Sequence, residues 1–96
     1  MKIYIAGKIT GNPSYKDEFR AARDALEQQG HIVLNPAVLP EGMSPADYMR
    51  ICFAMIDCAD EVCFLPSWER SSGAELEHCY CCYVGKPMRY MEEVAV

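Results

Sequence analysis

The sequence predicts an α/β domain in which a parallel sheet is covered by helices on both faces. Short apolar runs rich in β-branched residues alternate with longer segments whose apolar residues recur at helical spacing, in the order βαβαβαβ. Gly, Pro and Asn separate the two kinds of segment. Strands that are separated by helices pair in parallel through right-handed crossovers, so a single sheet between helices is expected.

All 96 residues are expected to form one domain, residues 1–96, because the chain is too short for two. Hydrophobic residues make up 51% of it, which is enough for a core and argues against disorder. The expected strands are residues 2–7 (KIYIAG), 31–37 (HIVLNPA), 61–66 (EVCFLP) and part of 88–96 (MRYMEEVAV); the expected helices are 12–30, 45–58 and 74–85, and residues 67–73 (SWERSSG) form a loop.

The helix boundaries are predicted from start and stop signals. Asn12 before Pro13 marks the start of the first helix, and Gly30 marks its end. Ser44 is expected to cap the second helix, with Pro45 at its first position. The expected apolar stripes are Tyr15, Phe19, Ala22 and Leu26 on the first helix and Tyr48, Ile51, Cys52 and Met55 on the second.

Three loops are expected at one edge of this sheet. They are residues 7–12 (GKITGN), 35–42 (NPAVLPEG) and 66–73 (PSWERSSG), and each follows a strand. Parallel α/β sheets bind ligands at the carboxyl ends of their strands. We therefore expect the binding site at the edge where these loops meet.

The charge of the chain excludes several classes of partner. A net charge of −5 and a pI of about 4.9 argue against a nucleic-acid polymer and against an anionic membrane surface. A small anionic ligand remains compatible, because backbone amides hold phosphate without net positive charge. The chain has no apolar run of about 20 residues and no signal-peptide pattern, so a cytoplasmic location is expected.

The six cysteines predict neither a disulfide framework nor a metal site. Thiols stay reduced in the cytosol, and no CxxC pair recurs at zinc-ribbon spacing. His78 and Cys79 are adjacent on a helix and point about 100° apart, so they do not easily share a metal. We expect the thiols to act as small buried hydrophobic groups and expect no metal and no cofactor.

Two carboxylates follow the Ser-Ser-Gly turn, Glu75 and Glu77. Residues two apart on a helix point about 160° apart, so these two do not act as a pair. Carboxylates in a first helical turn are favoured by the helix dipole alone. A single carboxylate at this edge also suits a nucleophile or a base. From these residues alone both interpretations stay open.

Two further features lie at the same edge. The segment AGKITG, which contains Gly7, has neither Walker A nor GxGxxG spacing, yet a glycine turn after a strand exposes amides that suit a small ligand. Trp68 is the only tryptophan, and it is expected to stack on a ligand ring or to fill a subunit interface, with loop packing as the alternative.

Taken together, these residues resemble the nucleoside 2-deoxyribosyltransferase superfamily, and most closely its small, often phage- or prophage-borne branch. The matching stretches are KIYIAGKITGNPSYKDEF, GHIVLNPAVLP and YMRICFAMIDCADEVCFLPSWERSSGAELEHCYCCYVGKP, which occur in the right order over nearly the whole chain. The resemblance implies a flavodoxin-like three-layer sandwich with a four- to five-stranded parallel sheet. It also implies a homodimer or a higher homo-oligomer that binds a nucleoside or nucleotide.

The resemblance also implies roles for individual residues. Glu77, four residues after Gly73, is the nucleophile that attacks the anomeric carbon of the sugar. Ser71 and Gly73 bind the 5′ end of the sugar or its phosphate. Tyr4 lines the pocket. Gly7 and its neighbours Lys8 and Ile9 form the opposite wall.

The chain departs from the family pattern at positions that bear on activity. Cys52 stands where the superfamily usually has an aspartate that protonates or holds the leaving base, and a thiol is a poor substitute for a carboxylic acid. Lys8 stands where a small residue or proline is commoner, and it is suited to contact a phosphate. The expected function is therefore N-glycosidic cleavage or deoxyribosyl transfer, with a nucleotide-binding module without catalysis as the alternative.

Overall fold

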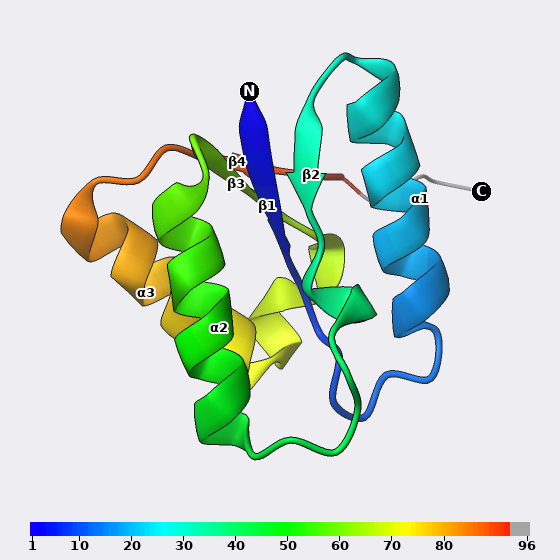
Figure 1. The fold of residues 1–96 in the computed structure, drawn as a ribbon, viewed down its shortest axis with the longest axis vertical. Helices are drawn as coiled ribbons and strands as arrows, with labels where there is room; N and C mark the ends of the chain where they lie inside the picture. The colour runs from blue at the N-terminus through cyan, green and yellow to red at the C-terminus, as the bar shows by residue number, and fades with distance from the viewer. Residues whose placement is uncertain (93–96) are drawn as a thin grey trace.

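The computed structural model describes residues 1–92 and confirms the expected fold class. Four strands pair in parallel in the order β2-β1-β3-β4 (Figure 1). Two short 3₁₀ turns, η1 and η2, follow the second and third strands. The elements are β1 (Lys2–Ala6), α1 (Tyr15–Gln28), β2 (Ile32–Leu34), η1 (Pro36–Val38), α2 (Pro45–Cys58), β3 (Glu61–Phe64), η2 (Pro66–Arg70), α3 (Ser72–Val84) and β4 (Met88–Tyr90).

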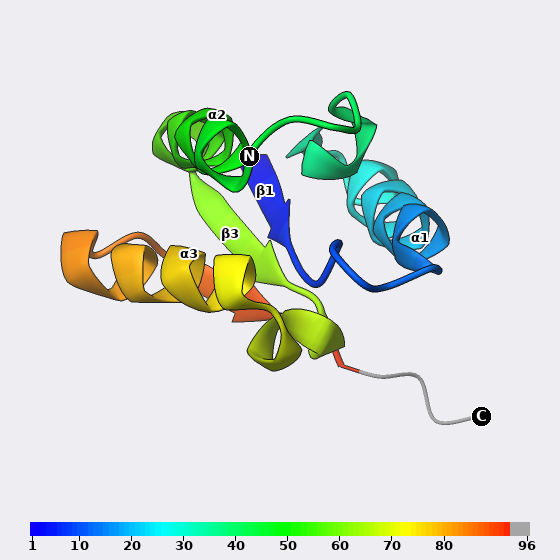
Figure 2. The ribbon, with the colours of Figure 1, turned by 90° about the horizontal axis from the view of Figure 1, so that it is seen from below.

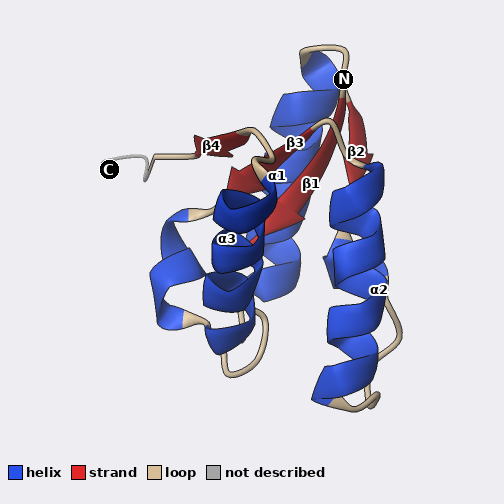
Figure 3. Ribbon diagram, turned by 90° about the vertical axis from the view of Figure 1, so that its left-hand side faces the viewer, coloured by secondary structure: helices blue, strands red, loops and turns tan. Residues whose placement is uncertain are grey.

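Helices cover both faces of the sheet, as expected of a three-layer sandwich (Figures 2 and 3). The side chains of β1 alternate between the two layers. Ile3 and Ile5 pack in the cluster that contains Phe19 of α1, whereas Tyr4 and Ala6 pack in the cluster formed with α2 and α3. Burial on both faces explains why this strand is a continuous apolar run.

The first helix begins later than the start signal suggested. Asn12 accepts a hydrogen bond from the backbone amide of Ser14 at 3.1 Å, so it closes a turn before the helix, which starts at Tyr15. The expected stop is confirmed, because Gly30 has a φ of +88° and lies just outside the helix.

The second helix has the predicted boundaries and cap. The Ser44 hydroxyl accepts from the amide of Asp47 at 3.2 Å, and Pro45 is the first helical residue. The predicted stripe is only partly right. Cys52 is buried as expected, but its buried companion is Ile56 one turn on, while the rest of the stripe is only partly buried.

The loop predicted at residues 67–73 is mostly helical. Residues 66–70 form η2, and α3 begins at Ser72 with Ser71 as its cap. The Ser71 hydroxyl accepts from the amide of Ala74 at 3.2 Å. The prediction placed the helix start at the residue after Gly73, because a glycine in the first turn resembles a loop residue.

The structure also corrects the expectation that all six thiols are buried. Three are buried and three are exposed: Cys52, Cys63 and Cys81 in the first group, and Cys58, Cys79 and Cys82 in the second. Cys63 is buried because it lies in the strand β3, and the other five thiols divide because α2 and α3 each turn only one face to the sheet. Within residues 1–92 no helix is long and apolar enough to cross a membrane. The predicted last strand is present as β4, and residues 93–96 of that segment lie outside the described residues.

Candidate active site

A cavity of about 880 Å³ opens at the carboxyl edge of the sheet, where the expected loops meet. Its wall is made by the turn after β1, the segment from η1 to the first turns of α2, and the junction of η2 with α3. Eight of the nine predicted site residues line it: Tyr4, Gly7, Lys8, Ile9, Cys52, Ser71, Gly73 and Glu77.

The buried carboxylate of this cavity belongs to Glu77. The residue is 4% exposed, and its Oε2 accepts a hydrogen bond from the Tyr4 hydroxyl at 2.5 Å. Glu75 is exposed, as the helical spacing predicted. The pairing of Glu77 with Tyr4 joins residues 73 positions apart and has no signal in the local sequence.

Burial raises the pKa values of both Glu77 and Tyr4. It raises the pKa of Glu77 to about 7, and the hydrogen bond from Tyr4 opposes that rise. Burial also raises the pKa of Tyr4 well above its usual value, and the charge of Glu77 adds to the shift. Tyr4 therefore stays a neutral donor, while the Glu77 carboxyl titrates near neutral pH. Carboxyl groups with such a shift inside a cavity are typical of catalytic sites.

Cys52 of α2 lines the cavity beside these two residues. Burial raises the pKa of its thiol; the Tyr4 hydroxyl opposes this rise, and the Glu77 charge adds to it. The thiol is thus protonated at neutral pH. It is a much weaker acid than a carboxylic acid in the same place.

The start of α3 forms one flank of the cavity. The Ser71 hydroxyl accepts from the helix and keeps its own proton free to donate outward. A Cβ atom on Gly73 would lie 3.4 Å from Cε of Met49, so Gly73 faces Met49 of α2 across this flank. Free amide groups and a hydroxyl at a helix start suit an anionic or hydroxyl-bearing ligand.

The turn after β1 forms the neighbouring part of the wall. The amide of Lys8 donates to the Ser67 hydroxyl at 3.0 Å, which joins this turn to η2. A Cβ atom on Gly7 would lie 3.1 Å from Leu65 and 3.2 Å from Cζ of Phe19, so only glycine fits without displacing its neighbours. The close packing holds Lys8 and Ile9 at the cavity wall.

Trp68 is the one predicted site residue that the structure places elsewhere. It is absent from the cavity lining and stacks on His78, with ring centroids 4.2 Å apart. It also contacts Phe64 edge to face. The orientation of η2 turns the indole toward α3 and away from the cavity, so the alternative of loop packing is the one observed.

Comparison with known proteins identifies the family. Residues 1–90 match the model of a family described as a domain of unknown function, DUF4406. The chain belongs to this family. No curated protein sequence matches it.

Two solved structures resemble this DUF4406 domain. A 2-deoxyribosyltransferase from the psychrotolerant bacterium Bacillus psychrosaccharolyticus has a TM-score of 0.74 at 20% identity, over 100% of this chain and 77% of that one. The 2-deoxyribosyltransferase from Leishmania mexicana has a TM-score of 0.73 at 20% identity, over 94% of this chain and 63% of that one. This similarity establishes the flavodoxin-like fold of the domain.

Several lining residues were not predicted from the sequence. The segment before α2 brings Leu39 to the cavity, and the first turns of α2 bring Tyr48 and Met49. The end of η2 brings Arg70. Tyr48 belongs to a stripe that was assigned to the core. Arg70 immediately precedes the Ser-Ser-Gly turn, so its position at the ligand edge was a signal that the prediction did not use.

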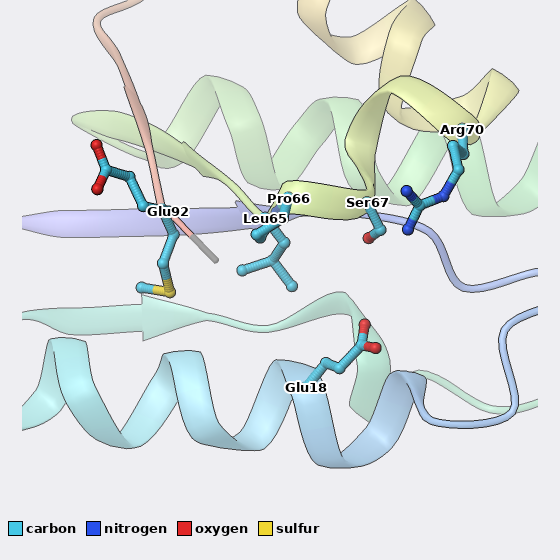
Figure 4. A pocket seen from close by; sticks show the side chains of 7 residues that line it. Glu18, Leu65, Pro66, Ser67, Arg70 and Glu92 are labelled. Atoms are coloured by element: carbon cyan, nitrogen blue, oxygen red, sulfur yellow. The ribbon is translucent and has the colours of Figure 1, made fainter. Parts of the chain in front are cut away.

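A second cavity of about 310 Å³ lies between η2, α1 and the residues after β4 (Figure 4). It is lined by Glu18, Leu65, Pro66, Ser67, Arg70, Met91 and Glu92. Arg70 thus lines both of these cavities in the DUF4406 domain.

Among residues 1–92, no three His, Cys, Asp or Glu side chains lie close enough together to hold a metal ion.

Proposed function

We propose that this DUF4406 domain cleaves the N-glycosidic bond of a nucleoside or a deoxynucleoside 5′-monophosphate and passes the sugar to water or to a second base. The observation that carries the proposal is Glu77, a buried carboxyl at the wall of an 880 Å³ cavity, held by Tyr4. The size of the cavity suits a ligand of nucleotide size. The fold shared with two 2-deoxyribosyltransferases supports the same chemistry.

The proposed reaction runs in two displacements. A carboxylate oxygen of Glu77 forms a bond to the anomeric carbon while the bond from that carbon to the base breaks. The base leaves with the electron pair and takes a proton from solvent, and a glycosyl ester of Glu77 remains. Water or a nitrogen of a second base then attacks the same carbon, loses a proton to solvent and frees Glu77.

The other lining residues have supporting roles in this proposal. The Tyr4 hydroxyl orients the nucleophilic carboxylate and stabilises its ionised form. Ser71 and Gly73 hold the 5′ end of the sugar. Lys8 and Ile9 form the wall on the side of β1.

The test is release of free base, measured by chromatography, from the common deoxynucleosides and their 5′-monophosphates. We expect release by the wild type and by Glu75→Gln, and a loss of about a thousandfold or more in Glu77→Gln. Glu75 is the matched control because it is an exposed carboxylate on the same helix. Equal release by wild type and Glu77→Gln contradicts the nucleophile, and a second base added to the wild type separates transfer from hydrolysis.

A second candidate is a nucleotide-binding module without turnover. Cys52 favours it, because a protonated thiol stands beside Glu77 where an aspartate is usual. A thermal shift with one nucleotide and no free base selects this candidate. If Cys52→Asp releases free base and the wild type does not, the thiol at position 52 is the cause of the lost activity.

The proposal includes a cytoplasmic location, membership of the small phage-type branch and assembly into a homodimer or higher homo-oligomer. The exposed apolar residues on α3 support the assembly, since Tyr83 is 93% exposed and Leu76 is 50% exposed.

A further inference from the structure

Two cations stand out in the lining of the large cavity because they lack ionic partners. The chain has nine Lys and Arg residues. Five of them form ion pairs, namely Lys16, Arg20, Arg23, Arg50 and Arg89. Lys86 donates to the carbonyl of Ala59. Within residues 1–92 this leaves Lys2, Lys8 and Arg70 without a side-chain bond, and the last two line the cavity.

Lys8 and Arg70 lie on the same flank. The backbone of Lys8 is bonded to the hydroxyl of Ser67, and Arg70 follows Ser67 in the same 3₁₀ turn. Figure 4 shows the guanidinium of Arg70 turned back toward Ser67. Next along the chain comes the Ser71 hydroxyl at the start of α3.

The flank contributed by the η1–α2 segment has a different character. Its lining includes Pro36, Leu39, Met43, Pro45, Tyr48 and Met49. The carboxylate on this flank, Glu41, is already engaged by Tyr15 at 3.1 Å and by Lys16 at 3.5 Å. The cavity therefore offers an apolar flank for a flat ring and a cationic flank for an anion, with Glu77 in the same lining.

Two carboxylates, Glu18 and Glu92, line the second cavity with Arg70, and neither forms an ion pair with it. The Glu18 carboxylate accepts from the Asn12 side chain at 3.0 Å. In a protein of net charge −5, two unpaired cations on one cavity wall provide a local positive field that attracts an anionic ligand.

We propose that Lys8 and Arg70 bind the phosphate of a nucleoside 5′-monophosphate, so that the substrate class is the charged nucleotide and not the free nucleoside. The inference rests on the proposed function, because it names the substrate of the same site. A phosphate monoester carries about −1.5 to −2 charges at pH 7, and Arg engages it through two parallel hydrogen bonds. The apolar flank takes the base, and the sugar spans the distance between them past Glu77.

The experiment measures affinity in the Glu77→Gln background, where turnover does not interfere. Calorimetry compares the four common deoxynucleosides with their 5′-monophosphates. We expect at least one monophosphate to bind about tenfold or more tightly than its own nucleoside, with a preference that weakens in high salt. Arg70→Gln and Lys8→Gln each lower that ratio about tenfold, whereas Arg20→Gln, a cation paired with Asp17 on α1, leaves it unchanged.

The outcomes separate this inference from the proposed function. Equal affinities for nucleoside and monophosphate, binding of neither, or a ratio that survives Arg70→Gln together with Lys8→Gln overturn the inference. Tight monophosphate binding without release of base by the wild type overturns the proposed function and leaves the inference standing. Release of base from nucleosides and monophosphates at equal rates supports the proposed function and overturns the inference that the phosphate is recognised.

Discussion

Glu77 combines two properties that conflict in a protein interior. It is 4% exposed, and the proposed chemistry needs it ionised. The single hydrogen bond from Tyr4 offsets only part of the cost of burial, so the pKa of Glu77 stays at about 7. A buried carboxyl that costs stability at a cavity wall is typical of a functional site.

The raised pKa makes stability depend on pH in a defined direction. The folded state binds the Glu77 proton more tightly than the unfolded state, whose carboxyl has a pKa of 4.5. The contribution of Glu77 to stability is therefore fully present below pH 4.5 and is lost as the pH rises through about 7. The difference of about 2.5 units corresponds to roughly 3 kcal/mol, since one unit is about 1.4 kcal/mol.

Glu77→Gln is expected to stabilise the protein in alkaline solution. Its neutral amide avoids the cost of burying a charge and still accepts from Tyr4. Urea unfolding is expected to show a free energy of unfolding higher than that of the wild type by about 1–3 kcal/mol at pH 8, and close to it at pH 4.5. Glu75→Gln is expected to show no such pH-dependent difference. An increment for Glu77→Gln that is equal at both pH values contradicts the raised pKa.

At the scale of the single residue, helical spacing separated the two glutamates but did not say which one is buried, and only the family resemblance pointed to Glu77. The helical repeat dictates that Glu75 and Glu77 face opposite ways. Which of them faces the sheet depends on how α3 is rotated, and that rotation follows from the packing of Cys81 and Ala74. The bond to Tyr4 depends on tertiary structure for the same reason.

At the scale of the element, the start of α3 places the proposed catalytic and binding groups together. Ser71 satisfies the amide of Ala74, and Glu77 projects from the second turn. Loss of this cap is expected to fray the first turn of the helix.

Ser71→Ala is expected to lower the free energy of unfolding by about 1 kcal/mol, because the amide of Ala74 loses its partner. Ser72→Ala is the matched control, since Ser72 is exposed and lies inside the helix, where alanine is well tolerated. Thermal or urea unfolding of the two variants measures the difference. Equal stabilities argue against the cap.

Element boundaries were predicted well where the capping signal was local. The Ser-Pro pair at the start of α2 gave the correct first residue because cap and first turn lie within four residues. The Asn-Pro pair before α1 also combines a capping residue with proline, but it closes a turn instead. The 3₁₀ turn η2 was missed because its one buried member, Ser67, is held by the backbone of a distant turn.

At the scale of the whole molecule, the parallel topology explains why residues far apart in sequence share one cavity. The loops after β1, β2 and β3 reach the same edge because all four strands point the same way. This consequence follows from the βαβ alternation and was predicted from the sequence. The cationic and apolar flanks of the cavity were not predicted, because they depend on how η1, η2 and α2 pack over that edge.

The exposed apolar face of α3 leads to a prediction about assembly. Leu76 and Tyr83 are seven residues apart, so they lie on one side of the helix. Light scattering on the purified protein is expected to give at least twice the chain mass of 10.8 kDa. Tyr83→Glu is expected to give the monomer, while Val38→Glu keeps the oligomer; Val38 on η1 is a matched control because it is also an exposed apolar residue, 74% exposed against 93% for Tyr83. A wild type of 10.8 kDa contradicts the oligomer.

The central claim is that Glu77 forms a covalent bond to the sugar, and mass spectrometry of the acid-quenched protein tests it most directly. The wild type is mixed with a deoxynucleoside 5′-monophosphate that it cleaves, and the quenched protein is digested. The account predicts an added glycosyl mass on the peptide that contains Glu77, absent from Glu77→Gln and present in Glu75→Gln. Release of base with no adduct under single-turnover conditions, or an adduct on another residue, would contradict it.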